Sequence, residues 1–230
     1  MKTLGMVGGI APGSTVDYYR LLIATYREQR QDGTYPSILI NSIDLTRMLD
    51  LISGNRLTEL TYWLLRELER LARGGADVGL LASNTPHIVF EELRREAPMP
   101  LLSIVEAASE AAYDLGLRTV GLLGTGFTMR GRFYPEVFAR RGIAVHAPSP
   151  EDQVYVHEKY MQELVPGELR PDTRQEFRAI IQRLAQDGAE GVLLAGTELP
   201  LLLRDAADCA VPLLDTTRIH VTRAVAELLG

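Results

Sequence analysis

Residues 75–83 read GADVGLLAS, and residues 188–196 repeat this pattern as GAEGVLLAG, 113 positions later. The opening stretch, TLGMVGG at 3–9, returns as TVGLLGT at 119–125, 116 positions later. Two separate matches with nearly one offset indicate a duplicated α/β unit. In open α/β sheets, ligands bind at the carboxyl ends of the strands. The repeat therefore predicts four such strand ends, two in each half, that face one another across one cleft.

Short apolar runs alternate with longer amphipathic ones along the whole chain, which is typical of α/β structure with a mostly parallel sheet. Strands are expected near 3–8, 37–41, 77–82, 101–103, 119–123, 143–146, 191–195 and 213–214. Helices are expected near 14–30, 56–74, 86–96, 105–115, 130–141, 152–165, 171–187, 199–207 and 217–229. The fold class is therefore α/β, with two pseudo-symmetric, Rossmann-like lobes and a ligand cleft between them.

No Ser- or Gly-rich linker separates the two halves, and the amphipathic stretch near 105–115 is the expected crossing point. The final helix follows a strand of the second half, and we expect it to return and pack on the first. The expected first lobe is 1–106 together with 215–230, and the expected second lobe is 107–214.

The composition narrows the functional classes. The chain has 230 residues, 46% of them hydrophobic, and a formal net charge of −6. That acidic balance argues against general nucleic-acid binding, which needs a basic face. No apolar run reaches the length of a membrane span and no secretory signal is visible, so we expect a cytoplasmic protein with no membrane association. Cys209 is the single cysteine, which excludes an internal disulfide and a multi-cysteine metal site, and no metal is expected.

A glycine turn, Gly8 and Gly9, stands just before the first predicted helix. Backbone N–H groups at a helix start attract carboxylates and phosphates, so this turn is a candidate ligand contact. The alternative is a strand-to-helix turn that merely needs glycine. The G-x-G-x-x-G dinucleotide pattern is not matched at residues 8–13, and Met129 stands where its third glycine would fall in the second half. We expect no cofactor.

Polar residues follow the next predicted strand end, as Ser83, Asn84, Thr85 and His87. Capping of the following helix by Asn84 or Thr85 would explain one or two of them, but not the set. We therefore expect the set to line a ligand site. His87 lies one turn into the helix, where its side chain could also point elsewhere.

The second half repeats both clusters. Thr125 and Thr128 correspond to the glycine turn, and their hydroxyls could hold a carboxylate or cap a helix. Thr197 and Glu198 correspond to the second cluster, where Glu198 could orient a ligand ammonium group or close a capping box.

A basic residue, Arg47, follows the second strand together with Asp44 and Arg56. The fork of an arginine matches the two oxygens of a carboxylate, so Arg47 is a candidate substrate clamp. An ordinary surface position explains it equally well.

Together these motifs resemble the aspartate/glutamate racemase family of cofactor-independent amino-acid racemases. SNTPH at 83–87 is similar to the family's C-N-T-A-H motif, and GTE at 196–198 is similar to its C-T-E motif. Further similar stretches are MVGG at 6–9, NSID at 41–44 and DTT at 215–217. The resemblance implies two Rossmann-like lobes, a homodimer, and an isomerase that needs no pyridoxal phosphate. It also implies two cysteine thiolates that exchange the α-proton from opposite faces of the substrate.

Both of those cysteines are replaced, by Ser83 and Gly196. A cysteine has a pKa of about 8.5 and can be a thiolate near neutrality, whereas a serine hydroxyl needs an adjacent base and glycine has no side chain. The remaining acid–base candidates are Ser83 and His87 on one side, with Thr197 and Glu198 on the other. Cys209 is expected to be a buried structural thiol.

Three interpretations of the function of this chain remain open. The lead reading is a family member that acts on or binds a small amino acid or dicarboxylate. A one-sided acid–base site would favour a lyase, decarboxylase or tautomerase, because racemisation needs a proton donor on each face. A non-catalytic ligand-binding protein is the alternative. Engineered replacement of the cysteines is a further explanation, although the flanking residues show no sign of it.

Overall fold

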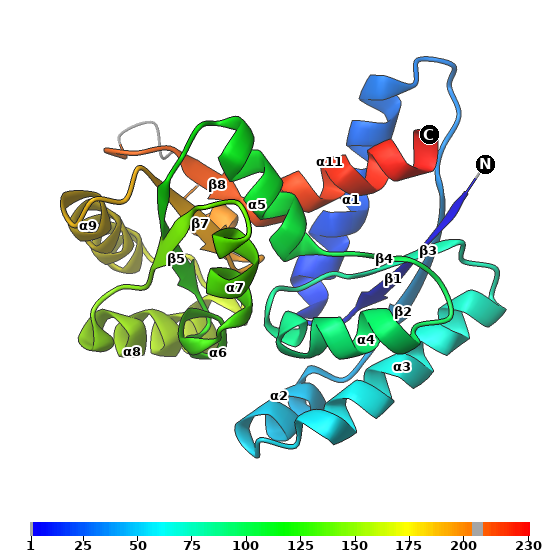
Figure 1. Cartoon of the computed structure of the whole chain (residues 1–230), viewed down its shortest axis with the longest axis horizontal. Helices are drawn as coiled ribbons and strands as arrows, with labels where there is room; N and C mark the ends of the chain where they lie inside the picture. Colours follow the sequence, from blue (N-terminus) through cyan, green and yellow to red (C-terminus); the bar gives the residue numbers. More distant parts are fainter. Residues whose placement is uncertain (1, 204–208) are drawn as a thin grey trace. The chain divides into compact units, whose positions relative to one another are not determined.

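The computed structural model describes residues 2–203 and 209–230. The chain forms two compact units (Figure 1). The first holds the chain up to Ser103 together with His220–Gly230, and the second holds Ile104–Ile219.

The first unit is built on a four-stranded parallel sheet in the order β2-β1-β3-β4. Its strands are β1 (Thr3–Gly8), β2 (Ser37–Ser42), β3 (Val78–Leu81) and β4 (Leu101–Leu102). Its helices are α1 (Pro12–Gln29), α2 (Leu45–Ser53), α3 (Leu57–Arg73), the 3₁₀ helix η1 (Thr85–Val89), α4 (Phe90–Glu96) and most of α11 (Thr216–Leu229).

Alternation along the strands gives this sheet two buried faces. Leu4, Met6 and Leu80 pack in one core with residues of α1 and α11. Gly5 and Gly79 face the other way, because a side chain at either position would meet a leucine of α3. Helices therefore cover both faces of the sheet, which explains why its inner strands are almost continuously apolar.

The second unit repeats this plan in the order β6-β5-β7-β8, again all parallel. Its strands are β5 (Thr119–Gly124), β6 (Ala144–His146), β7 (Gly191–Ala195) and β8 (Leu213–Asp215). Its helices are α5 (Ile104–Asp114), α6 (Gly126–Arg130), α7 (Phe133–Ala139), α8 (Pro150–Lys159), the π-helix η2 (Tyr160–Leu164), α9 (Pro171–Gln186) and α10 (Leu199–Leu202). One core lies under α5 and α7, and the other under α8, η2 and α9.

The sequence repeats occupy equivalent strands. β1 and β5 are each the second strand of their sheet, and β3 and β7 are each the third. The prediction of an α/β fold made of two similar units with parallel sheets is confirmed.

Several helices differ from the sequence-based expectation. α2 and α6 were not expected, and the helix expected at 130–141 is the shorter α7. α6 and α7 are two separate helices. They are separated at Gly131, whose backbone is extended and whose added side chain would meet Phe127 O at 2.8 Å. The helix expected at 152–165 changes to a π-helix at Tyr160. α10 ends at Leu202, and positions 204–207 of the helix expected there lie outside the described residues.

None of the described helices combines the length and the hydropathy needed to cross a bilayer.

Candidate functional site

The glycine turn after β1 is held together by its own chain. Gly9 has a φ of +85°, and a Cβ there would stand 2.3 Å from Ile43 O. The Gly9 N–H donates to Thr15 Oγ1 at 2.8 Å, so that donor is used within the unit. A Cβ on Gly8 would stand 2.5 Å from Thr15 Cγ2. Gly13 behaves differently, because it is exposed and open space surrounds its Cβ position.

The cluster after β3 is buried. Ser83, Asn84 and Thr85 are all less than a tenth exposed. Asn84 precedes η1 but its side chain makes no cap hydrogen bond to that helix. Helix capping therefore does not explain Asn84, and its amide remains a candidate ligand group.

His87 belongs to the interior of the first unit. Its ring stacks on Phe90 at a centroid distance of 4.7 Å and meets His220 edge-on at 6.5 Å. Its side chain is hydrogen-bonded to the backbone of Ser83 and Asn84. Burial, and then the nearby His220, lower the pKa of His87 to about 3. His87 is therefore neutral near pH 7, and it orders the 83–84 backbone.

His220, at the start of the part of α11 that belongs to the first unit, extends this buried network. Its Nε2 lies 3.1 Å from Leu102 O, and its Nδ1 lies 2.9 Å from the Tyr18 hydroxyl. Burial lowers the pKa of His220 to about 4, against the opposing effect of the Leu102 carbonyl. A neutral ring that donates from Nε2 accepts from Tyr18 at Nδ1.

In the second unit, Thr125 is a helix cap. Its hydroxyl accepts from the Thr128 N–H at the start of α6 and lies 3.2 Å from the Thr128 hydroxyl. The Gly126 N–H donates to His157 Nδ1 at 3.1 Å. Partial burial, and then Arg130, lower the pKa of His157. The capping interpretation therefore accounts for Thr125, while both threonines lie buried at the end of β5.

The end of β7 carries the most chemically distinctive arrangement. Glu198 is 4% exposed, and its Oε2 accepts hydrogen bonds from the Tyr160 and Thr197 hydroxyls, the latter at 2.9 Å. The Tyr160 ring lies beside Gly196, where an added Cβ would be 2.5 Å from Cε2 and 2.9 Å from the hydroxyl oxygen. Glu198 makes no side-chain cap bond to α10, so the capping-box alternative does not apply. A carboxylate, a phenol and a hydroxyl thus meet at one strand end.

Arg47 lies on the exterior of the first unit. Asp44 caps α2 by accepting from the Thr46 and Arg47 N–H groups. The Arg47 guanidinium lies over the Trp63 ring, 4.7 Å from its centroid, which pins the side chain between α2 and α3. Arg56 lies 3.7 Å from Glu59 in an exposed ion pair.

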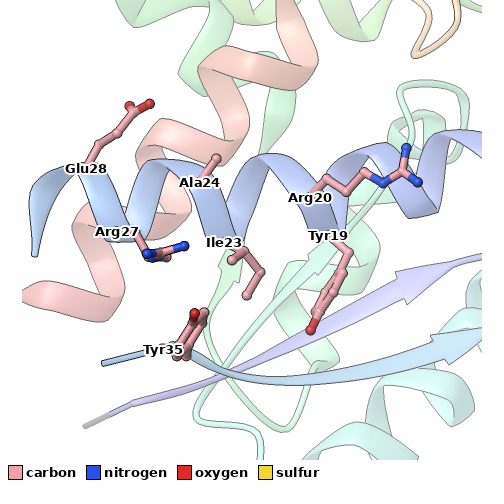
Figure 2. Close-up of a pocket in the computed structure, with 7 residues that line it drawn as sticks. All are labelled: Tyr19, Arg20, Ile23, Ala24, Arg27, Glu28 and Tyr35. Atoms are coloured by element: carbon pink, nitrogen blue, oxygen red, sulfur yellow. The ribbon is translucent and has the colours of Figure 1, made fainter. Parts of the chain in front are cut away.

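A shallow pocket of about 440 Å³ lies elsewhere on the first unit, between α1 and the segment that leads into β2 (Figure 2). It is lined by Tyr19, Arg20, Ile23, Ala24, Arg27, Glu28 and Tyr35. The Arg27 guanidinium stands over the Tyr35 ring at 5.4 Å. None of the strand-end candidates lines this pocket.

Two functional candidates were missed by sequence reasoning, Tyr160 and His220. Tyr160 is 38 positions from its partner Glu198, and His220 is 202 positions from Tyr18. Nothing in either local pattern signals such a contact. Cys209 is partly buried and packs against the core under α8 and α9. Among the described residues, no group of three or more His, Cys, Asp or Glu side chains is placed to hold a metal ion.

Comparison with known proteins agrees with this architecture. A crystal structure of an aspartate racemase homologue from Pyrococcus horikoshii OT3 superposes with a TM-score of 0.83 at 34% identity, over 99% of each chain. A Yersinia pestis structure described as a candidate Asp/Glu racemase gives a TM-score of 0.91 at 30% identity, over 100% of each chain. The Bacillus subtilis (strain 168) broad specificity amino-acid racemase RacX is 24% identical over 241 residues, 99% of this chain and 98% of its own length.

The family model described as Asp/Glu/Hydantoin racemase matches residues 7–224, which include both strand-end clusters and every strand except most of β1. With the two parallel four-stranded sheets and the full-length structural matches, this places the chain plainly: it belongs to the Asp/Glu/Hydantoin racemase family.

Proposed function

We propose that this chain binds a small amino acid or dicarboxylate at the buried polar residues that follow its strands and exchanges the α-proton of that ligand without thiols. One observation carries the proposal. Polar side chains that are almost fully buried follow the equivalent strands β3 and β7, at 83–85 and at 197–198. Ligands of open α/β sheets bind at the carboxyl ends of the strands, so buried polar side chains concentrated there favour a ligand role.

The chemistry differs from that of a two-thiol racemase. Ser83 and Gly196 stand where the resemblance places the cysteines, and Cys209 packs in a core instead. A serine needs an adjacent base to act, and the neutral His87 is bound to backbone rather than placed as a strong base. Glu198 is the carboxylate available for proton transfer. We therefore propose proton transfer on one face of the ligand, which also suits a lyase, decarboxylase or tautomerase.

Binding without turnover is the second candidate. The observation that favours it is the packing at Gly196, where the Tyr160 ring fills the space that a side chain would occupy. Under this hypothesis the chain retains the groups that bind a carboxylate and has lost the groups that catalyse a reaction of the ligand. A homodimer and a cytoplasmic location accompany both candidates as proposals from the family resemblance.

Two measurements on the purified protein separate these candidates. Calorimetry with the enantiomers of aspartate and glutamate, other small amino acids and succinate measures binding. Proton NMR in deuterium oxide measures α-deuteration of each amino acid. We expect at least one ligand to bind and one enantiomer to lose its α-proton signal. Binding with no exchange across the panel would favour the non-catalytic candidate, and no binding at all would refute the proposed function.

A matched pair of variants localises the binding. Asn84→Ala should weaken binding about tenfold, because losing one hydrogen bond of roughly 1.5 kcal/mol corresponds to that factor. Asn55→Gly removes an exposed amide from a turn where φ is 52°, which glycine adopts readily, and should leave affinity unchanged. Equal affinities for the two variants would contradict a ligand contact at Asn84.

A further inference from the structure

The carboxyl end of β7 contains a buried phenol held against a buried carboxylate. The Tyr160 hydroxyl donates to Glu198 Oε2, and the Thr197 hydroxyl donates to the same oxygen at 2.9 Å. Tyr160 and Glu198 are 5% and 4% exposed. Hydrogen bonds are electrostatically stronger in such buried surroundings than in water.

The phenol sits where residue 196 would carry its side chain. A Cβ on Gly196 would be 2.5 Å from Tyr160 Cε2 and 2.9 Å from its hydroxyl oxygen. Real Cβ atoms essentially never make contacts this short, so a side chain at 196 would require the Tyr160 ring to shift. The Tyr160 side chain, which comes from η2, therefore occupies the space beside the end of β7 that a side chain at 196 would take.

The backbone that carries Tyr160 is itself irregular. α8 ends at Lys159, and η2 begins at Tyr160 as a π-helix in which the Val165 N–H donates to Tyr160 O at 2.9 Å. Within this turn, Glu163 accepts hydrogen bonds from Thr173 and from Lys159. π-helical turns inside α-helices are rare and are found frequently at functional sites.

Burial, and then the charge of Glu198, raise the pKa of Tyr160 well above its ordinary value. The phenol is therefore protonated at neutral pH, and a free phenolate is not available as a base. A proton can still be moved through the phenol, because one can arrive at its oxygen while its own proton leaves to the carboxylate.

We propose that Tyr160 and Glu198 form a proton relay that serves the α-carbon of the bound ligand in place of a side chain at position 196. The proposal rests on the proposed function, namely that an amino acid binds at these strand ends. As the Cα–H bond breaks, its proton bonds to the Tyr160 oxygen, and the electron pair stays on the ligand. The original Tyr160 hydroxyl proton passes to Glu198 Oε2. The reverse transfer returns a proton to Cα, so no other reactant is needed.

The experiment follows α-deuteration by NMR in deuterium oxide, with aspartate, glutamate and other small amino acids, for wild type and three variants. Tyr160→Phe keeps the ring and removes the hydroxyl, while Glu198→Gln keeps the shape and removes the base. Tyr155→Phe is the matched control, since Tyr155 lies one turn away on α8 and packs near Phe177. We expect the first two to slow exchange by about a hundredfold to ten-thousandfold and the control to match wild type.

Calorimetry with the same amino acids separates loss of the relay from loss of the site. We expect the affinity of each variant to stay within about threefold of wild type, since the relay acts on the reaction rather than on binding. If Tyr160→Phe does not fold, Glu198→Gln decides the outcome. If either variant exchanges the α-proton at the wild-type rate, the relay is wrong, while the proposed function is not contradicted. Absence of wild-type exchange overturns the relay together with the proton exchange of the proposed function, and the binding isotherm then shows whether the proposed ligand binding fails as well.

Discussion

The Tyr18 hydroxyl lies 2.9 Å from His220 Nδ1, and this contact joins the first long helix of the chain to its last one. The other ring nitrogen of His220 meets Leu102 O at the edge strand of the same sheet. Both side chains are fully buried. The neutral form of His220 satisfies both partners, whereas a charged ring would lose its acceptor for Tyr18.

This arrangement makes stability depend on pH. Unfolded histidine binds a proton near pH 6.5, whereas the folded pKa values are about 4 for His220 and about 3 for His87. Below pH 6.5 the unfolded state therefore binds more protons, and the free energy of unfolding falls as pH falls. Each histidine contributes a slope of about 1.4 kcal/mol per pH unit within that window. The contribution is fully present above pH 6.5.

Urea unfolding of wild type and His220→Asn between pH 7 and pH 5 tests this slope. We expect the variant to be less stable at pH 7 and to lose less stability on acidification, because one of the two buried histidines is gone. His146→Asn is the control, since His146 is exposed on β6. Parallel pH profiles for His220→Asn and wild type would contradict the neutral, buried assignment.

Alanine at Gly9 in the first turn and alanine at Gly13 at the start of α1 should have different effects on the free energy of unfolding. Gly9→Ala places a side chain on a backbone with φ of +85°, 2.3 Å from Ile43 O, and should cost more than about 2 kcal/mol of unfolding free energy. Gly13→Ala meets nothing within 4 Å inside α1 and should be neutral or stabilise by up to about 1 kcal/mol. Thermal unfolding of both variants gives the comparison. Similar melting temperatures would mean that the turn is not built as described.

The π-helical turn should depend on a buried hydrogen bond between Thr173 and Glu163. Thr173→Val keeps the shape and removes the donor, and it should cost about 1–3 kcal/mol, because the carboxylate is left partly unsatisfied. Thr34→Val removes the same kind of bond, to Asp32 at the surface, and should have little effect. Urea midpoints of the two variants measure the difference. Equal midpoints would show that Glu163 does not need Thr173.

The local pattern of apolar residues predicted the strands and their repeat, because buried parallel strands have a distinctive apolar signature. Every expected strand is present in the structure. The same kind of pattern could not predict where α8 becomes a π-helix, because the sequence of residues 152–165 is typical of one amphipathic helix. The polar strand ends were visible as clusters, but their chemistry depends on distant partners. Glu198 acquires its role from Tyr160, and a sequence window cannot show a contact that spans 38 positions.

The packing of Tyr160 against Gly196 determines how thiols could be restored. With the native tyrosine, Gly196→Cys should cost about 1–3 kcal/mol, because its Cβ would overlap a ring that is packed in a core. Ser83→Cys combined with Gly196→Cys should therefore give no racemisation.

Adding Tyr160→Ala to these two changes opens the space, and this triple variant should racemise an amino acid that wild type binds. Each positioned proton-transfer group typically contributes about a hundredfold to ten-thousandfold, so the activity should exceed background. Chiral chromatography measures it, with Tyr160→Ala alone and Ser83→Cys combined with Tyr160→Ala as controls, because neither of these variants has a proton donor on each face. Racemisation by the double variant at wild-type stability would show that the Tyr160 ring moves to make room for a side chain at 196. Binding without racemisation by the triple variant would show that thiols at 83 and 196 do not reach the α-carbon.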